Sequence, residues 1–215
     1  MKSGHKNEKK LKIPEPSILR LSVYRRCLQN FKETTTLSFI SSAELGKLSN
    51  RNAAIVRKDL SHFGEYGVPG KGYEVDQLLN KIVELMNLAD AQRVVLVGAG
   101  NLGRALLGYP GFKKQGFCFV AAFDKDTKKI GRKIGDITIK GVGGLKSEIK
   151  KQNIKMGVLT VPAHAAQETA NLMVEAGVGA IINFTPVGIW VPPKIILRNV
   201  DLTRELEIAS YYLSD

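Results

Sequence analysis

The stretch VVLVGAGNLGRALL, from Val94 to Leu107, decides the fold of this 215-residue chain. An apolar, β-branched run leads into a turn with three glycines, and the residues that follow are typical of a helix. Gly98 permits a tight turn, Gly100 lets a phosphate approach the backbone, and Gly103 lets the helix pack closely on the strand. The N–H groups at the start of the helix then face the phosphates. The pattern predicts a dinucleotide site formed by Gly98, Ala99, Gly100, Asn101, Leu102 and Gly103.

An acidic residue follows at the distance that such a site requires. Asp124 comes 21 residues after Gly103 and ends the next apolar run, FCFVAAF. A carboxylate at this position accepts hydrogen bonds from the ribose hydroxyls and repels a 2′-phosphate, which favours NAD(H) over NADP(H). Three nearby basic residues, Lys125, Lys128 and Lys129, weaken that preference.

From residue 89 to residue 200, strands alternate with helices. The runs RVVLV, FCFVAAF, DITIK, MGVLTVP, GAIINFTP and KIILRNVD indicate strands, with helical patterns between most of them. This order predicts an α/β fold in which a Rossmann-type parallel sheet is wound on both faces. Val161 and Pro162, after the MGVLT strand, lie at the carboxyl edge of that sheet and flank the nicotinamide. The last segment, 201–215, contains an amphipathic helix over 202–213.

The chain shows no catalytic constellation. His164 follows Pro162, but a lone His at the start of a helix is more often a cap or a surface residue, and no titratable partner lies near it in sequence. The sheet and its helices use nearly all of residues 90–215, which leaves no substrate domain. We therefore expect no enzyme activity, and we expect the dinucleotide to act as a signal.

Residues 13–88 show a different order of elements: a helix, an extended segment, a short helix, a turn, a longer helix and a glycine-rich hairpin at 64–73. Ser41 and Glu44 form a capping box that starts the short helix. This order predicts a winged helix-turn-helix domain in which residues 50–62 enter the major groove. Its inner face is expected to comprise Ala54, Ile55, Val56, Leu60 and Phe63, and its DNA contacts Arg51, Asn52, Arg57 and Lys58, with Lys71 in the wing. The alternative is a structural helical bundle with a charged outer face.

Charge supports a nucleic-acid partner. The net charge is +12, and residues 1–73 hold 14 basic and 6 acidic residues, so the first third of the chain carries two thirds of the excess. Residues 1–12 form a basic arm that is expected to be disordered. The two cysteines, Cys27 and Cys118, lack metal-ligand spacing and indicate reduced core residues of a cytoplasmic protein, and no apolar run of about 18 residues predicts a membrane span.

Several motifs together resemble the Rex family of NAD(H)-responsive bacterial repressors. They cover about residues 13–213 and include RKDLSHFGEYG, GKGYEVDQLL, VGAGNLGRAL, YPGF, AAFD, LTVPAHAAQ, NFTPV and RNVDLTREL. The resemblance implies a homodimer that binds a palindromic operator, is released by NADH, and controls genes of fermentation, respiration and NAD recycling. It also implies a C-terminal helix exchanged between subunits.

The resemblance further assigns three residues to a switch. Tyr109 matches a tyrosine near the nicotinamide that changes partners with redox state, and Asp201 matches the aspartate that this tyrosine meets. Arg20 resembles the arginine that links the DNA-binding domain to that aspartate.

Two other functions stay open at this point. One is a small NAD-dependent dehydrogenase with a basic appendage. The other is a CoA-binding sheet of similar topology, which Asp124 disfavours because the ribose of CoA carries a 3′-phosphate and has no free diol.

Overall fold

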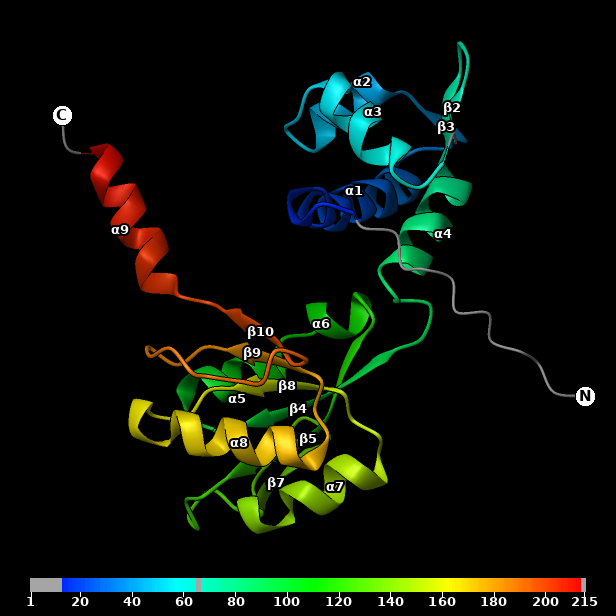
Figure 1. Ribbon diagram of the computed structural model, residues 1–215. Coiled ribbons are helices and arrows are strands. Elements are labelled where there is room, and N and C mark those ends of the chain that lie inside the picture. The colour runs from blue at the N-terminus through cyan, green and yellow to red at the C-terminus, as the bar shows by residue number, and fades with distance from the viewer. Residues whose placement is uncertain (1–12, 65–66, 214–215) are drawn as a thin grey trace, which may run out of the picture. The chain divides into compact units, whose positions relative to one another are not determined.

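A computed structural model describes residues 13–64 and 67–213 (Figure 1). The chain divides into two compact units, residues 1–89 and 90–215. The predicted basic arm, residues 1–12, lies outside the described residues. Each unit has its own hydrophobic core.

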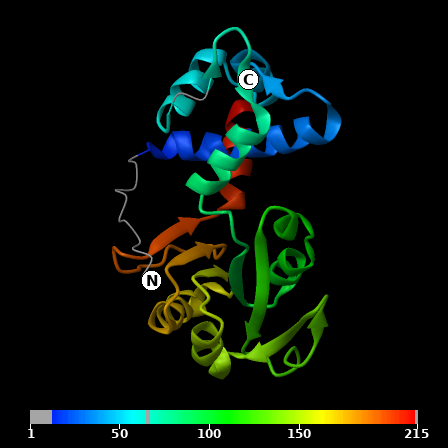
Figure 2. The ribbon, with the colours of Figure 1, turned by 90° about the vertical axis from the view of Figure 1, so that its right-hand side faces the viewer.

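The first unit is a small helical domain with a short sheet. Helices α1 and α4 cross and pack against each other (Figure 2). The antiparallel sheet has the strand order β1-β3-β2. Its elements are α1 (Glu15–Thr34), β1 (Phe39–Ile40), α2 (Ser42–Leu48), α3 (Ala53–Ser61), β2 (Gly67–Val68), β3 (Gly72–Glu74) and α4 (Val75–Leu85). This is the predicted winged helix-turn-helix arrangement, with β2 and β3 as the wing.

Local sequence explains the helix-turn-helix. The predicted capping box is confirmed, because the Ser41 side chain accepts a bond from the Glu44 N–H and the Glu44 carboxylate accepts one from the Ser41 N–H. Within α2, a Cβ built on Gly46 would lie 2.5 Å from the Arg51 carbonyl oxygen, so only glycine lets the following turn pack this closely on the helix. Asn50 occupies the left-handed region, with φ of 54°, which Asn tolerates better than most residues.

The second unit is a seven-stranded sheet with the order β10-β9-β8-β4-β5-β7-β6. All pairs are parallel except β6·β7, which is antiparallel. The chain starts in the centre at β4, moves to β5 and β7 on one side, and then returns to β8 on the other. The strands are β4 (Gln92–Val97), β5 (Phe117–Asp124), β6 (Lys133–Ile134), β7 (Ile137–Gly141), β8 (Met156–Leu159), β9 (Ala180–Asn183) and β10 (Ile196–Asn199).

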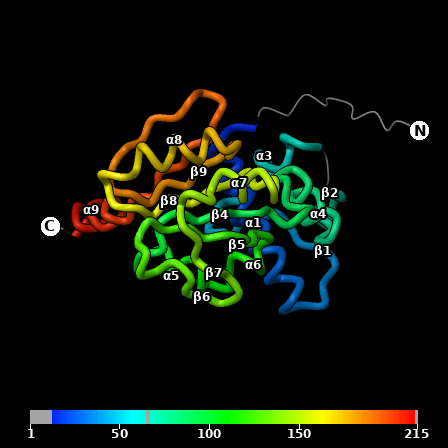
Figure 3. The backbone as a smooth tube through the Cα atoms, turned by 90° about the horizontal axis from the view of Figure 1, so that it is seen from below, coloured from blue at the N-terminus to red at the C-terminus, as the bar shows by residue number. Residues whose placement is uncertain are grey.

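Helices cover both faces of this sheet, as predicted. Val95 and Val97 of β4 pack toward α7 and α8, whereas Val94 and Leu96 pack with Leu106 of α5 on the opposite face. Figures 1 and 3 show α8 and α5 on opposite sides of β4. The helices are α5 (Asn101–Gly108), α6 (Gly111–Lys114), α7 (Leu145–Lys151) and α8 (Ala166–Ala176), with short 3₁₀ turns at Val142–Gly144 and Ala163–Ala165. The order in which strands are added to the sheet therefore reverses between β4 and β8. Ligands bind at this switch point in such sheets.

The last helix, α9 (Leu202–Leu213), has none of its twelve residues buried. Leu206 is 72% exposed and Leu213 is 83% exposed. Within the described part of a single chain, the apolar residues of α9 are therefore not buried by other elements.

Some details of the expected core are wrong. Val56, Leu60 and Phe63 are buried, but Ala54 is exposed and Ile55 is half-buried. The reason is geometric: the inward stripe of the nine-residue helix α3 passes through Val56, Asp59 and Leu60, and Ala54 lies on the other side. Both cysteines are free, as expected, but each is only half-buried.

Candidate dinucleotide and DNA-binding sites

A cleft of about 960 Å³ opens at the carboxyl ends of β4, β5 and β8. The predicted residues that line it come from three separate turns: Gly98, Gly100, Asn101 and Leu102 after β4, Asp124 at the end of β5, and Val161 and Pro162 after β8. Sequence reasoning missed other lining residues, among them Val142, Leu145 and Thr160. Val142 and Leu145 follow β7 in a segment that carries no recognisable motif, whereas Thr160 lies within the motif LTVPAHAAQ, next to the predicted Val161.

The three glycines of the turn have different surroundings. Gly98 has a φ of +105°, and a Cβ there would lie 2.6 Å from the Thr160 carbonyl. A Cβ on Gly103 would lie 2.1 Å from the Gly98 carbonyl oxygen, so the first turn of α5 packs directly on the end of β4. A Cβ on Gly100 would meet no protein atom within 4 Å. Gly98 and Gly103 are thus required by packing, whereas Gly100 leaves space in the cleft.

Asp124 is the buried carboxylate of the cleft, with 6% of its surface exposed. It accepts hydrogen bonds from the Asp126 N–H at 2.9 Å and from Lys129 Nζ at 3.0 Å. Burial alone would raise the pKa of Asp124, but these bonds, the Lys129 charge and a bond from the Ala99 backbone outweigh it and hold the pKa below its usual value. Asp124 is therefore ionised at neutral pH, although Lys129 offsets its charge.

Not every predicted nucleotide residue lies in the cleft. Ala99 and Gly103 are buried behind the turn, and Ala99 acts through its backbone bond to Asp124. Tyr109 is 60% exposed and does not line the cleft; its ring contacts Phe112 edge to face, with ring centroids 5.3 Å apart. His164 lines the cleft beside Lys125, with 3.4 Å between His164 Nε2 and Lys125 Nζ. Glu168 lines the same cleft, but within residues 13–64 and 67–213 no hydrogen bond or ion pair joins an acidic side chain to His164.

The residues present fit a dinucleotide. The start of α5 supplies backbone N–H groups beside Gly100, and the space around the Gly100 Cα is open. This arrangement suits a pyrophosphate. A buried, ionised carboxylate at the next strand end suits a ribose diol. Among residues 13–64 and 67–213, no group of His, Cys, Asp or Glu side chains could hold a metal ion. In the same residues, no helix has the length and apolar character that crossing a membrane would take.

The predicted DNA contacts are exposed on α3, its preceding turn and the wing. Arg57 donates to Ser42 Oγ at 3.0 Å, Arg51 donates to the Asn50 carbonyl at 2.7 Å, and Lys71 lies 5.9 Å from the centre of the Phe39 ring. Lys58 is exposed near the end of α3. All four cationic groups are accessible to a phosphate backbone.

Asn52 has a structural role that the sequence did not reveal. It is the N-cap of α3, where its Oδ1 accepts the Ile55 N–H at 2.8 Å. A bidentate contact to adenine uses both the oxygen and the nitrogen of an Asn amide. The predicted base contact of Asn52 therefore competes with the cap.

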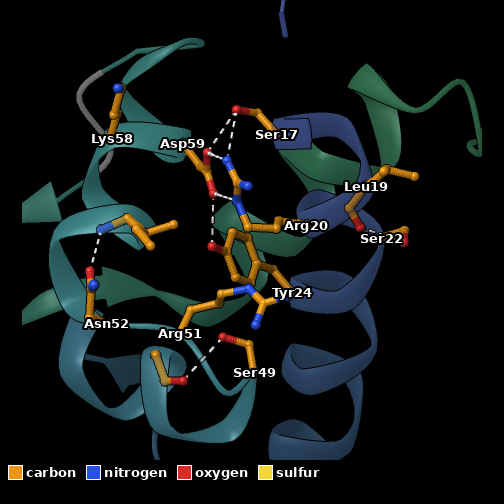
Figure 4. Close-up of polar contacts among 12 residues, drawn as sticks. Ser17, Leu19, Arg20, Ser22, Tyr24, Ser49, Arg51, Asn52, Lys58 and Asp59 are labelled. Carbon is orange, nitrogen blue, oxygen red and sulfur yellow. Dashed lines mark hydrogen bonds and ion pairs between the residues drawn. The ribbon is translucent and has the colours of Figure 1, made fainter. Parts of the chain in front are cut away.

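An ionic network that sequence reasoning missed ties α3 to α1 (Figure 4). Asp59, 1% exposed, accepts bonds from Arg20 Nε at 2.6 Å and Nη2 at 2.7 Å, and from Ser17 Oγ and Tyr24 OH, both at 2.8 Å. Burial would raise the pKa of the Asp59 carboxyl, but the bonds from Arg20, Ser17 and Tyr24 lower it below its usual value. Arg20, predicted as a switch residue, is thus held within its own domain by a bidentate pair.

Asp201, which is also predicted as a switch residue, directly precedes α9. Its Oδ1 accepts the N–H groups of Thr203 at 3.0 Å and Arg204 at 3.2 Å. Asp201 therefore caps the exposed helix and is itself exposed.

Comparison with protein-family models gives two matches. A model of the CoA binding domain matches residues 89–187, and a model described as the putative DNA-binding protein N-terminus matches residues 12–61. The first covers the sheet and its cleft, and the second covers α1 to α3. Asp124 lies within the first match.

Curated relatives span the whole chain. The redox-sensing transcriptional repressor Rex of Desulforamulus reducens is 41% identical over 206 residues, which is 96% of this chain and 98% of that protein. Rex of Carboxydothermus hydrogenoformans is 43% identical over 205 residues, covering 94% of this chain and 97% of that protein.

Solved structures agree with these relatives. The protein RSP in complex with β-NAD⁺ and operator DNA has a TM-score of 0.88 and 36% identity, covering 94% of this chain and 92% of that one. RSP in complex with β-NADH has a TM-score of 0.82 and 35% identity, covering 94% of each chain. RSP is described as a Rex-family repressor. With relatives above 40% identity over nearly its full length, this chain belongs to the Rex family of redox-sensing transcriptional repressors.

Proposed function

We propose that this protein is a transcriptional repressor that binds operator DNA and is released from it by NADH. It is a sensor of the NADH/NAD⁺ ratio and not an enzyme. Its targets are genes of fermentation, respiration and NAD recycling, and it works in the cytoplasm, where that DNA and the coenzyme pool lie. The proposal extends to this chain what is known of its Rex relatives.

One observation carries the proposal: a nucleotide cleft with a buried ribose carboxylate and a basic helix-turn-helix occur in the same chain. The cleft contains Asp124 and the Gly98 turn, and the helix-turn-helix exposes Arg57 and Lys58. A dehydrogenase would need a group that moves a proton at the nicotinamide end. Within residues 13–64 and 67–213, the side-chain contact of His164 is with Lys125, which offers no carboxylate to orient or charge the imidazole.

The proposed ligand contacts follow from the cleft. The N–H groups at Asn101 and Leu102 bind the pyrophosphate, with Gly100 allowing close approach. Asp124 accepts the ribose hydroxyls while Lys129 and the Ala99 backbone hold its carboxylate in place. Val161 and Pro162 flank the nicotinamide ring.

The proposed dimer depends on α9. Its leucines and tyrosines are exposed in the single chain, and a second copy that exchanges this helix would cover them. A dimer also provides two recognition helices for the two halves of a palindrome, about 34–36 Å apart on one face of the duplex.

Release requires that NADH bind better to a dimer with the wrong helix spacing, since only a difference in affinity shifts an equilibrium. Tyr109 and Asp201 are the proposed partners near the nicotinamide, and Arg20 is the proposed link to the DNA-binding domain. Because Arg20 already pairs with Asp59 on α3, a change in its bonding would act directly on the recognition helix.

Fluorescence anisotropy tests this function. The full-length protein is titrated onto a labelled palindromic operator, selected from a random pool by its binding to this protein. The same titration is then repeated with NAD⁺ and with NADH. NADH should weaken binding by at least about tenfold, and NAD⁺ should leave it nearly unchanged. Equal effects of the two coenzymes, or substrate-dependent oxidation of NADH without specific DNA binding, would overturn the proposal in favour of a dehydrogenase.

A further inference from the structure

The tip of the wing is a tight β-turn formed by residues 68–71. The Lys71 N–H donates to the Val68 carbonyl oxygen at 3.0 Å and closes the turn. Pro69 and Gly70 are its central residues, and Gly70 has a φ of +76°. These features define a type II turn, in which proline fixes the first central residue and glycine takes the positive φ of the second. The tip is therefore preorganised and loses little conformational entropy when it binds a partner.

The base of the wing is fixed to the helix-turn-helix. Tyr73 of β3 is buried in the same core as Val56 and Leu60 of α3. Burial raises the pKa of the Tyr73 hydroxyl and the charge of Arg57 on α3 opposes this rise, so the Arg57 guanidinium lies near β3. A Cβ on Gly72 would lie 2.4 Å from a carbonyl oxygen of β1, so β3 packs tightly against that strand. The hairpin is thus held beside α3, and its tip projects beyond the helices of the first unit (Figure 1).

The projecting tip is apolar. Val68 is 44% exposed, and the next residue, Pro69, is exposed as well. Lys71 is the one cationic residue of the segment 67–74, and its Nζ lies 5.9 Å from the centre of the Phe39 ring in β1. The positive charge of the wing therefore lies toward β1, and the side chains at the tip carry no charge.

An uncharged tip suits one part of a DNA duplex. When α3 occupies the major groove, an element that projects beside it reaches the phosphate backbone and the adjacent minor groove. A tip without a charge cannot form an ion pair with a phosphate. Proteins that enter the minor groove commonly insert apolar side chains there, proline among them. Arg57 and Lys58 on α3, together with Lys71 beside the tip, attract the polyanion that such a contact requires.

We propose that the wing tip, Val68–Pro69, enters the minor groove of the operator beside the α3 site and makes an apolar contact there. The inference rests on the proposed function, because it requires an operator duplex bound by α3. It adds to that function a contact that depends on the shape of the minor groove. Lys71 stays outside the groove and pairs with a phosphate. The wing therefore makes two physically different contacts, and only the one from Lys71 weakens with salt.

Salt dependence separates these two contacts. The operator affinity of the full-length protein is measured by anisotropy over a series of salt concentrations, for the wild type, Val68→Ser and Lys71→Gln. Val68→Ser keeps the Pro69–Gly70 turn but loses apolar surface, so it should bind at least about fivefold more weakly at every salt concentration, with an unchanged salt slope. Lys71→Gln should flatten the slope by about 0.9 for each bound wing. A flatter slope in Val68→Ser, or wild-type affinity of that variant at every salt concentration, would overturn the inference.

The matched control is Leu37→Ser, which removes an apolar side chain that is 60% exposed in the same unit but outside the wing. Its operator affinity and salt slope should equal those of the wild type. Because Val68 and Leu37 are both exposed, neither variant should lower the melting temperature of the protein. An equal loss of affinity in Leu37→Ser and Val68→Ser would overturn the inference, since it would mean that the wing tip has no special role.

Modified operators test whether the contact lies in the minor groove. In the base pairs that flank the α3 site, adenine is replaced by diaminopurine, which adds a minor-groove amino group, or guanine by inosine, which removes one. At one flanking position or more, the exchange should change the affinity of the wild type by at least about fivefold and that of Val68→Ser by less than about twofold. Equal responses of the two proteins would overturn the inference.

The proposed function and the wing contact fail in different ways. If the wild-type protein binds no duplex selected from a random pool, the proposed function is refuted, and the wing contact with it. If it binds a selected operator specifically but is insensitive to Val68→Ser and to the minor-groove exchanges, only the wing contact is refuted.

Discussion

Asp124 combines burial, ionisation and a lysine partner at the ribose edge of the cleft. Replacing it with Ala should weaken NADH binding by about 1.5–3 kcal/mol, roughly ten- to a hundredfold, because a charged acceptor of the ribose hydroxyls is lost. Operator binding without coenzyme should not change, since the DNA-binding residues belong to the other unit. Calorimetric titration measures the first effect and anisotropy the second. Asp136→Ala, an exposed carboxylate outside the cleft, is the control, and equal losses in both variants would contradict the assignment.

Asp59 should make the stability of the first unit depend on acid pH. Its pKa is held below the usual value by Arg20, Ser17 and Tyr24, so its contribution is present above the unfolded pKa near 4 and disappears as pH falls through the lower folded pKa. Asp59→Asn should reduce the free energy of unfolding at pH 7 by about 2–3 kcal/mol, less than for a fully buried pair because Arg20 is 26% exposed. Urea unfolding from pH 7 to pH 3 should show a shallower acid decline for this variant than for the wild type. Parallel declines would show that Asp59 titrates normally.

These two carboxylates differ in how far the sequence predicts them. Asp124 follows a glycine motif at a fixed spacing, so its place in the cleft could be predicted. Asp59 stands among Arg57, Lys58 and Ser61 and has the appearance of a solvated residue. Its burial depends on Arg20, 39 residues away, and on the angle at which α1 crosses α3, which no local pattern encodes. The sequence likewise does not show which nearby lysine pairs with Asp124, because the pairing with Lys129 depends on side-chain packing.

At the level of elements, substitutions of the α3 N-cap residue Asn52 can separate its role in helix stability from its predicted contact with DNA. Asn52→Ala should lower the free energy of unfolding by about 1 kcal/mol, because the Ile55 N–H loses its acceptor. Asn52→Ser keeps a capping oxygen and should unfold like the wild type. The operator affinity of the Ser variant, measured by anisotropy, then shows how much the Asn52 side-chain amide contributes to DNA binding. Unchanged affinity would limit Asn52 to capping, and the predicted adenine contact would be wrong.

Two glycines at the start of α5 should respond differently to a methyl group. Gly103→Ala places a Cβ against the Gly98 carbonyl and should cost about 1–3 kcal/mol of stability. Gly100→Ala meets open space in a conformation that Ala adopts, so stability should change little, while NADH binding weakens by about tenfold or more because the phosphate loses its room. Thermal melts and NADH titrations of both variants measure this contrast. A destabilised Gly100→Ala protein with normal NADH binding would contradict it.

Most elements follow from the sequence because each has a local cause. Ser41 and Glu44 start α2, the glycine turn starts α5, and apolar runs mark the parallel strands. The β6–β7 hairpin was not predicted, since β6 is the two-residue strand Lys133–Ile134 with no apolar alternation. This hairpin nevertheless supplies Lys133 and Ile134 to the wall of a second, smaller cavity beside the dinucleotide cleft.

For the whole molecule, the proposed coupling of coenzyme and DNA is reciprocal. If NADH weakens operator binding by a given factor, operator DNA must weaken NADH binding by the same factor. The NADH dissociation constant, measured with and without saturating operator, should differ by the factor found in the anisotropy titration. A scrambled duplex of equal length is the control for charge alone. Equal NADH affinity in all three conditions would mean that the two sites are independent.

Helix α9 adds a consequence of its own. Its leucines stay exposed to solvent until a second copy covers them. The concentration of the proposed dimer therefore rises with the square of the free chain concentration. At low expression, halving gene dosage would then remove more than half of the assembled protein. Target promoters would respond to the copy number of the regulator gene as well as to the metabolic state of the cell.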